Sequence, residues 1–457
     1  MPKKKTALTI EERLQQALVP AEEQPYEVPE NWVWVRLGEV NKYVSKSVNP
    51  ISEPDKIFEL YSVPSMADDY PEIIAGSDIG SSKQSVCKED VLLCKINPRI
   101  NRVWKVSQFT DNELIASSEW IIIRNNHINA NYLMYCFQSK YFREFMLSNV
   151  SGVGGSLMRA QPKYVQTYPI PLPPLSEQQR IVERIEELFA KLDEAKERLQ
   201  EVADSFAVRK AAILHKAFTG ELTKQWRREN GVSDESWEEI TWGSFIEKIE
   251  AGKNWNALGR PPKNGEFGVV KVSAVTWGEF LEDESKTCTE ESQWNEEKRI
   301  SVGDFLFSRA NTIQLVGNCV IVKDVKRKLM LSDKILRFSL SERVYDFFAL
   351  WYTRTSSYRK QIESVASGNQ DGMRNISQNN MKMIIFPLPT LPEQHEIVRL
   401  IDDLLARERA AQQAAEQALA SIDLMKKSIL ARAFRGELGT NKASEASALE
   451  LLRQVLS

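Results

Sequence analysis

The chain has 457 residues, of which 42% are hydrophobic and 27% are charged, and its formal net charge is −3. This balance is typical of a soluble protein with two or more domains, and it gives no overall signature of nucleic-acid binding. A local basic patch would still be sufficient for such binding. The sequence has no run of about 20 apolar residues, the length that a membrane span needs. Its basic start, MPKKKTALTI, leads into charged residues rather than an apolar segment, so we do not interpret it as a signal peptide.

The cysteines are scattered along the chain, and no two of them have the C-x-x-C spacing of a zinc or redox site. They are odd in number, which argues against a disulfide framework. Free thiols of this kind are typical of a reducing compartment, so we expect a cytoplasmic protein. The five residues are Cys87, Cys94, Cys136, Cys288 and Cys319.

Residues 1–30 predict a short helix, roughly from Ile10 to Leu18, followed by a connector rich in Pro and Glu. Two domains of mixed pattern follow, which we place at residues 31–156 and 223–372. Short apolar runs such as DVLLCKI and NCVIVKDV indicate strands, and amphipathic aromatic runs such as YLMYCFQSKYFREFM indicate helices. The pattern favours an α+β fold in which an α/β domain occurs twice.

Each domain is followed by a long helical segment, at residues 157–222 and 373–438. PLPPLSEQQRIV and AFTGEL in the first segment return as PLPTLPEQHEIV and AFRGEL in the second, at a constant offset of 216 residues. Proline cannot continue a helix, so it marks each start, where Ser176 and Gln179 suggest a capping box. Gly220 and Gly436 stand where each helix would stop. We expect helices of about 40 residues, and a further short helix in the tail at 439–457.

Both helical segments carry apolar residues at alternating steps of three and four, which is the pattern of a coiled coil. Arg209 interrupts the first series and Glu408 interrupts the second. The obvious partner of each helix is the other helix. The residues that we expect at the helix seam are Ile181, Ile185, Leu188, Leu192, Leu199, Val202, Ile397, Ile401, Leu404, Ile422, Met425 and Ile429.

The two domains also match each other at isolated points. Trp32 corresponds to Trp237, Asp90 to Asp304, and the pair Met158-Arg159 to Met373-Arg374, always in the same order. Ordered matches together with an ungapped helical copy indicate an internal duplication of nearly the whole chain.

Known catalytic motifs do not occur in the sequence. The chain has three histidines, no phosphate-binding G-x-x-x-x-G-K-[ST] loop, and no Asn/Asp-Pro-Pro-aromatic signature of amino-group methyltransferases. The glycines of SGVGGS, at residues 151–156, do not recur fully in the second copy. We therefore expect no catalytic residue, no metal site and no cofactor in this chain.

Polar, basic and aromatic clusters on predicted loops occur in both halves, in NKYVSKSVNP, CKINPRINRVWK, GKNWNALGRPPK and FSRANTI. Arg and Lys contact phosphates and guanine edges, and Asn pairs with adenine, so such loops suit a DNA groove. Solvated turn residues are the alternative interpretation for any single member. The expected DNA contacts are Lys42 next to Tyr43, Lys46, Lys95, Asn97, Arg99, Arg102, Arg159, Lys253, Asn254, Asn256, Arg260, Arg309, Asn311 and Arg374.

The order of a variable domain, a PLPPLxEQ helix ending in AFxGEL, a second variable domain and a PLPxLxEQ helix ending in AFRGEL resembles the specificity subunit of Type I restriction–modification enzymes. The resemblance covers the chain from about Asn31 to Leu438. It implies two target-recognition domains that each read half of a bipartite double-stranded DNA site. The two long helices would pack antiparallel, in a pseudo-twofold arrangement, and hold these domains at a fixed spacing. Short helices at the two ends of the chain would close a circular arrangement.

The resemblance also implies the partners. Two methyltransferase (modification) subunits would bring S-adenosylmethionine to adenine, and motor/nuclease (restriction) subunits would use ATP and Mg²⁺. A self-sufficient DNA methyltransferase, or a coiled-coil scaffold with no DNA role, are the alternative functions. The first would need a donor-binding glycine motif and a catalytic Pro-Pro loop, which the sequence lacks.

Overall fold

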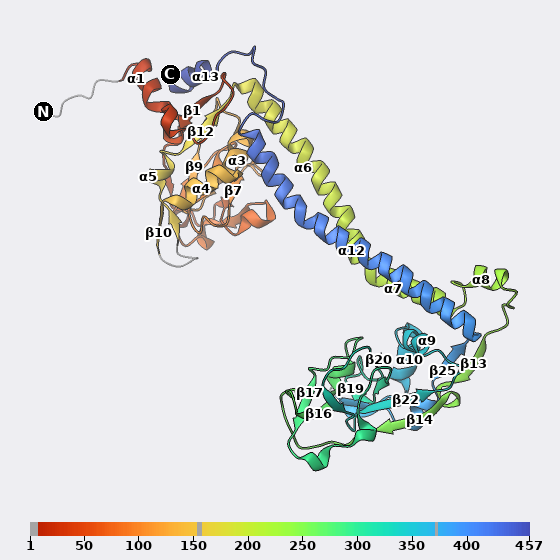
Figure 1. Ribbon diagram of the computed structural model, residues 1–457. Helices are drawn as coiled ribbons and strands as arrows, with labels where there is room; N and C mark the ends of the chain where they lie inside the picture. The colour runs from red at the N-terminus through yellow and green to blue at the C-terminus, as the bar shows by residue number, and fades with distance from the viewer. Residues whose placement is uncertain (1–7, 153–157, 371–372) are drawn as a thin grey trace. The chain divides into compact units, whose positions relative to one another are not determined.

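A computed structural model of the chain describes residues 8–152, 158–370 and 373–457 (Figure 1). The chain divides into two compact units, each with its own core. Unit 1 comprises Met1–Leu199 and Gln417–Ser457, and unit 2 comprises Gln200–Glu416. The domain ends that the sequence suggested at 156 and 372 lie outside the described residues.

Unit 1 contains a mixed five-stranded sheet of order β2-β5-β8-β3-β4, a three-stranded sheet β7-β6-β9, and the pairs β1-β12 and β10-β11. Its helices are α1 (Ile10–Ala17), α2 (Leu37–Val40), α3 (Ala130–Gln138), α4 (Lys140–Ser148), α5 (Pro162–Val165), the first part of α6 (Leu175–Asp204), the last part of α12 (Leu391–Ala433) and α13 (Ala448–Leu456). Its strands are β1 (Val33–Arg36), β2 (Ser47–Val48), β3 (Ile57–Tyr61), β4 (Glu72–Ala75), β5 (Lys83–Ser85), β6 (Val91–Cys94), β7 (Val103–Lys105), β8 (Glu113–Ala116), β9 (Trp120–Ile123), β10 (Val150–Ser151), β11 (Arg159–Ala160) and β12 (Pro169–Leu172).

Unit 2 contains the four-stranded sheets β14-β22-β18-β20 and β15-β17-β16-β21, the three-stranded sheet β19-β24-β23, and the pair β13-β25. Its helices besides α12 are α7 (Phe206–Phe218), α8 (Lys224–Glu229), α9 (Asp346–Tyr352), α10 (Ser356–Val365) and α11 (Gln378–Lys382). Its strands are β13 (Glu238–Thr241), β14 (Ile246–Ala251), β15 (Ala257–Leu258), β16 (Phe267–Val270), β17 (Ser285–Cys288), β18 (Phe305–Ser308), β19 (Ala310–Asn311), β20 (Cys319–Ile321), β21 (Lys328–Met330), β22 (Ile335–Leu340), β23 (Ser367–Gln370), β24 (Met373–Asn375) and β25 (Ile385–Leu388).

The strand pairing repeats between the units, as the internal duplication predicted. β3 pairs in parallel with β8 and antiparallel with β4, and β16 pairs in the same way with β21 and β17. β1 pairs with β12, and β13 pairs with β25, in the same antiparallel register. The fold class is therefore confirmed: an α/β domain occurs twice in one chain.

The helical segments pair antiparallel within each unit. In unit 1, Lys426 of α12 donates to Asp193 of α6 at 2.5 Å, and in unit 2, Arg209 of α7 donates to Glu408 of α12 at the same distance. Arg209 follows Asp193 in the sequence, whereas its partner Glu408 precedes Lys426. The first helical segment and α12 therefore run in opposite directions. Arg209 and Glu408 are the two residues that interrupt the apolar pattern, and they pair with each other.

The residues expected at the helix seam differ in how far they are buried. Ile181, Ile185, Ile397, Ile401 and Ile422 are buried. Leu188, Leu192, Leu199, Leu404 and Ile429 are only partly buried.

Two of the expected seam residues are wrong, since Val202 is 39% exposed and Met425 is 48% exposed. Val202 lies in the last turn of α6, which ends at Asp204. Leu405 is buried rather than Leu404 because it belongs to the hydrophobic core of unit 2, together with Ile397 and Ile401. The first helix also differs from the prediction because its regular pattern ends at Asp204 and resumes at Phe206.

The Glu-Gln pair of each PLPxLxEQ motif ties its helix to the recognition domain. In unit 1, Glu177 is fully buried, and its Oε2 accepts hydrogen bonds from Trp32 Nε1 at 2.9 Å and Asn441 Nδ2 at 2.8 Å. Gln178 accepts from the backbone N–H of Asn129, which caps α3. These contacts replace the capping box expected from Ser176 and Gln179, because the helix already begins at Leu175.

Unit 2 repeats the arrangement with a stronger donor. Glu393 is fully buried, and its Oε1 accepts from Arg227 at 2.7 Å, from Thr223 at 2.6 Å and from Trp237 at 3.2 Å. Gln394 accepts from the backbone N–H of Tyr345, at the start of α9. A buried carboxylate needs such donors, because an unpaired buried charge costs several kcal/mol.

The helices α1 and α13, which lie near opposite ends of the sequence, meet in unit 1. α1 packs on α13, and Leu14, Leu452 and Val455 are buried in one core with strand and helix residues of the recognition domain. Arg180 fixes the segment before α13 through two hydrogen bonds of 2.8 Å to Glu445. The C-terminal tail is therefore an integral part of the fold of unit 1.

Replacing Leu452 with alanine should lower the free energy of unfolding of unit 1 by roughly 2–5 kcal/mol, because the cavity would lie in a closed core. Gln454→Ala changes an exposed position of the same helix and serves as the control. Urea unfolding of the full chain would measure both variants. Equal midpoints for the two variants would contradict the packing of α13.

Candidate nucleic-acid interface

In each unit, the residues expected to contact DNA converge where a buried strand leaves the sheet beside a β-hairpin. In unit 1, β6 ends at Cys94, and the next residues pair with β11. Ala160 N–H donates to the carbonyl of Lys95 at 2.8 Å, and Asn97 N–H donates to the carbonyl of Met158 at 2.8 Å. Lys95 and Asn97 are therefore neighbours of Arg159, although Arg159 follows Asn97 by more than 60 residues in the sequence.

Unit 2 builds the same feature more regularly. β18 continues through Arg309 into β19, which pairs with β24 so that Asn311 faces Arg374. Ile376 N–H donates to the carbonyl of Arg309 at 2.9 Å. The fold thus brings Arg309, Asn311 and Arg374 together, in the places that Lys95, Asn97 and Arg159 occupy in unit 1.

The basic residues of these clusters differ in their hydrogen-bond and ion-pair partners within the protein. Lys95 Nζ donates to the carbonyl of Ser118 at 2.7 Å, and exposed Arg159 pairs with Glu119 at 3.2 Å. Arg374 NH1 donates to the carbonyl of Gly368, within its own hairpin. Arg309 forms no ion pair with any residue that the structure describes. A partly exposed guanidinium of this kind can donate to a phosphate or to a guanine edge.

The other expected contacts do not all join these clusters. Lys253, Asn254 and Asn256 are exposed and follow β14, which leaves its sheet at the same end as β18, on the other side of β22. Their loop therefore lies at the sheet edge that carries Arg309. Arg99 is exposed and Arg102 is partly buried, both in the loop between β6 and β7.

Lys42 lies away from Lys95 along β9. Lys42 N–H donates to the carbonyl of Arg124 beyond the end of β9, whereas Lys95 N–H donates to the carbonyl of Glu119 before its start. Five residue steps along the strand, about 16 Å, separate these points. The backbone of Lys42 is therefore not beside that of Lys95.

Arg260 is held by an acidic neighbour. Its guanidinium forms two hydrogen bonds of 2.7 Å to Glu266 and also donates to Thr287. Arg260 holds the pKa of Glu266 down to about 2. The side chain remains 41% exposed, so a DNA contact by Arg260 stays a prediction.

Thr276 and Asn318, which the sequence did not single out, support the site in unit 2. Asn311 Nδ2 donates to Thr276 Oγ1 at 3.2 Å, and Asn318 Nδ2 donates to the carbonyl of Thr276 at 2.8 Å. They fix the loop after β16 against β19. Nothing in the local sequence pattern indicates this contact, because it joins segments that are 35 and 42 residues apart.

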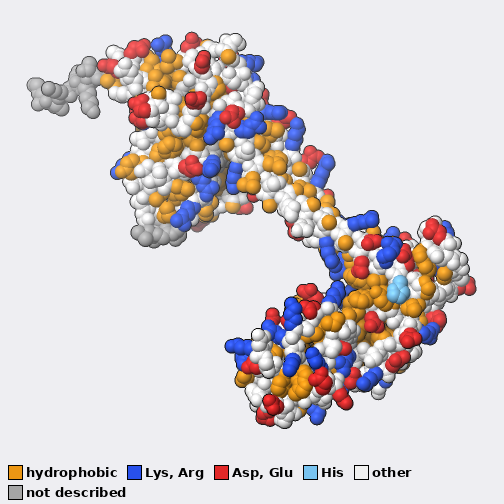
Figure 2. All heavy atoms as spheres, viewed as in Figure 1, with side chains coloured by type: hydrophobic (Ala, Val, Ile, Leu, Met, Phe, Trp, Pro, Cys, Tyr) orange, Lys and Arg blue, Asp and Glu red, His pale blue; other side chains and the backbone are white. Residues whose placement is uncertain are grey.

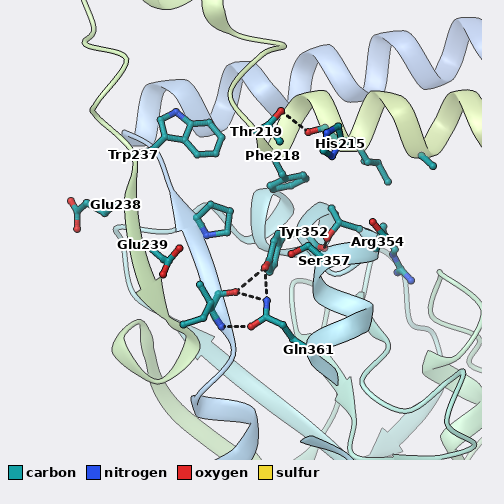
Figure 3. A pocket seen from close by; sticks show the side chains of 16 residues that line it. His215, Phe218, Thr219, Trp237, Glu238, Glu239, Tyr352, Arg354, Ser357 and Gln361 are labelled. Carbon is teal, nitrogen blue, oxygen red and sulfur yellow. Dashed lines mark hydrogen bonds between the residues drawn. The ribbon is translucent and has the colours of Figure 1, made fainter. Parts of the chain in front are cut away.

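A cavity of about 500 Å³ in unit 2 lies between α7, β13, β25 and α9, and its walls include Phe218, Trp237 and Tyr352 (Figure 3). Gln361 bridges α10 and β25 there, since it donates to the carbonyl of Ile385 at 3.1 Å and accepts from its N–H at 2.7 Å. The residues expected to contact DNA do not line it. On the face that Figure 2 shows, basic and acidic side chains are interspersed over each unit.

The described residues include no group of three or more His, Cys, Asp or Glu side chains that could hold a metal ion, and no helix long and apolar enough to cross a membrane. Burial raises the pKa of the Cys136 and Cys319 thiols to about 12, which keeps both protonated near neutral pH.

The comparisons with known proteins agree with the duplicated architecture. The family model of the Type I restriction modification DNA specificity domain matches residues 29–204 and again residues 234–418. The chain is 27% identical over 318 residues to the EcoKI specificity subunit of Escherichia coli K12, covering 68% of this chain and 66% of that protein. It is 25% identical over 414 residues to the MjaVIII specificity subunit of Methanocaldococcus jannaschii, covering 86% and 91%.

Solved structures share the fold. The HsdS subunit of Thermoanaerobacter tengcongensis superposes with a TM-score of 0.67 at 21% identity, covering 91% of this chain and all of that one. A chain from work on the assembly and conformational transition of the type I R-M system gives 0.61 at 22% identity, with the same coverage. With the family model matched in both halves, this chain belongs to the Type I restriction–modification DNA specificity family.

Proposed function

We propose that this chain is a non-catalytic specificity subunit that reads a bipartite double-stranded DNA site and directs adenine methylation or restriction by partner subunits. The observation that carries this proposal is the repeated reading surface, in which a basic residue and an asparagine follow a buried strand and lie beside an arginine of a hairpin. Two such surfaces in one chain fit a target with two half-sites. Arg and Lys are the side chains that donate to guanine edges and phosphates.

The chemistry of the complex would come from partners. Two methyltransferase subunits would supply S-adenosylmethionine, and motor/nuclease subunits would supply ATP hydrolysis with Mg²⁺. The duplication supports two equivalent methyltransferase copies, one for each unit. This chain would hold the reading surfaces, and α6 and α12 would set the distance between them.

Replacing Arg309 with alanine should weaken binding of the assembled complex to its target by about tenfold, because the side chain offers a guanidinium without an acidic partner. If Arg309 contacts a phosphate, the slope of log affinity against log salt should fall by about 0.9. Titration of the complex with a labelled duplex at several salt concentrations would measure both quantities.

Arg343→Ala is the matched control for this variant. Arg343 is a 62% exposed arginine of unit 2 that pairs with Glu238, at the β13 side of the unit. We expect its affinity and salt slope to match the unmodified protein. Equal affinities for the two variants would contradict a DNA contact by Arg309.

A heptad inserted after Leu199 and another after Glu416 should lengthen the gap between the half-sites. The two insertions keep the helices matched, and each adds about 10 Å. At 3.4 Å per base pair, the gap should grow by at most about 3 base pairs. The methylated motif in cells that carry this variant would report the gap. Efficient methylation with an unchanged gap would show that the helices do not set the spacing.

A further inference from the structure

Trp277 is the most exposed tryptophan side chain among the large hydrophobic residues of unit 2, at 66% of its surface. It follows Thr276, whose side chain and carbonyl are bound by Asn311 and Asn318. Asn311 belongs to β19, the strand that carries the candidate reading residues. Trp277 therefore projects beside the reading surface of this unit.

The loop that presents Trp277 is held firmly on both sides. Ala274 and Val275 before it are fully buried, and Leu281 N–H closes the loop by donating to the carbonyl of Ala274 at 3.0 Å. Gly278 follows with a φ of +98°, a conformation that a residue with a Cβ rarely adopts. Arg354 donates to the carbonyl of Gly278 at 3.3 Å.

The indole itself has no comparable support. Among the described residues, no aromatic ring or cation packs against Trp277, although other tryptophans of the unit, such as Trp242 and Trp294, lie against aromatic partners. An exposed indole contributes no hydrophobic free energy to folding, because most of its apolar surface stays in water. If the indole packed against a ligand, that surface would be buried and the burial would stabilise the complex.

Resting on the proposed function, we propose that Trp277 is a specificity-determining residue of unit 2, which packs its indole against a base of the second half-site. Asn311 holds the loop in place, while its neighbours Arg309 and Arg374 supply the polar contacts. In the major groove of a duplex, apolar side chains read the methyl group at the edge of thymine. The contact adds no charge, which distinguishes it from the contacts of the basic residues.

Three variants of the full chain, each assembled with its methyltransferase partner, test this assignment. Trp277→Ala removes the indole, and Trp277→Phe keeps an aromatic face. Val302→Ala is the control, because Val302 is equally exposed, at 64%, but precedes β18, whereas β19 follows that strand. The readouts are affinity for the target duplex at several salt concentrations and the methylated motif in cells.

For Trp277→Ala we expect an affinity loss of about tenfold, an unchanged salt slope, and relaxed preference at a position of the second half-site only. Trp277→Phe should recover most of the affinity, and Val302→Ala should behave like the unmodified chain. Unaltered affinity and motif in Trp277→Ala would overturn the assignment. A change in the salt slope or in the first half-site would overturn it too, since either would indicate a different role.

Failure of the proposed function would look different. In that case the unmodified complex would show no sequence-dependent binding and no bipartite methylated motif. If the unmodified complex binds and methylates its target while Trp277→Ala does the same, only the role of Trp277 is wrong.

Discussion

The fold of each unit depends on a buried carboxylate at the start of its long helix. Glu177 and Glu393 stand 216 residues apart in the sequence and are both fully buried. Each accepts a hydrogen bond from the tryptophan that precedes the first strand of its domain, Trp32 or Trp237. Each also accepts from the segment that follows the C-terminal end of the partner helix, which is α12 for Glu177 and α7 for Glu393. Removing the donors would leave a buried charge unpaired, so strand, helix and incoming segment are held as one structure.

This constraint explains why the two ends of the chain are structured together. In unit 2 the donors Thr223 and Arg227 come from the chain directly after α7. In unit 1 the corresponding donor, Asn441, comes from the chain after α12, near the C-terminus. Residues near the C-terminus therefore complete the first recognition domain. Burial also raises the pKa of Glu177, so the hydrogen bonds to its carboxylate offset a real cost of ionisation.

Much of the architecture could be predicted from the sequence, because the duplicated motifs and the apolar period are local signals. The two α/β domains, the helix pair and the clustering of Lys95 with Asn97 follow from them. The exposure of Val202 and Met425 could not be predicted, since the apolar spacing shows neither where the first helix is interrupted nor which face each helix buries. The internal pairing of Arg260 with Glu266 and the bond from Asn311 to Thr276 depend on tertiary contacts, which no local pattern encodes.

The most direct test of the account is an exchange of residues 31–172, from the tryptophan-bearing start to β12, with the matching segment of a relative that has a different target. These residues include both strands of the β1–β12 pair, so the exchange keeps this strand pair intact. Sequencing of methylated sites in cells that carry the hybrid would give its motif. The account predicts one new half-site, with the other half-site and the gap unchanged. A hybrid that alters both half-sites would contradict independent reading by the two units.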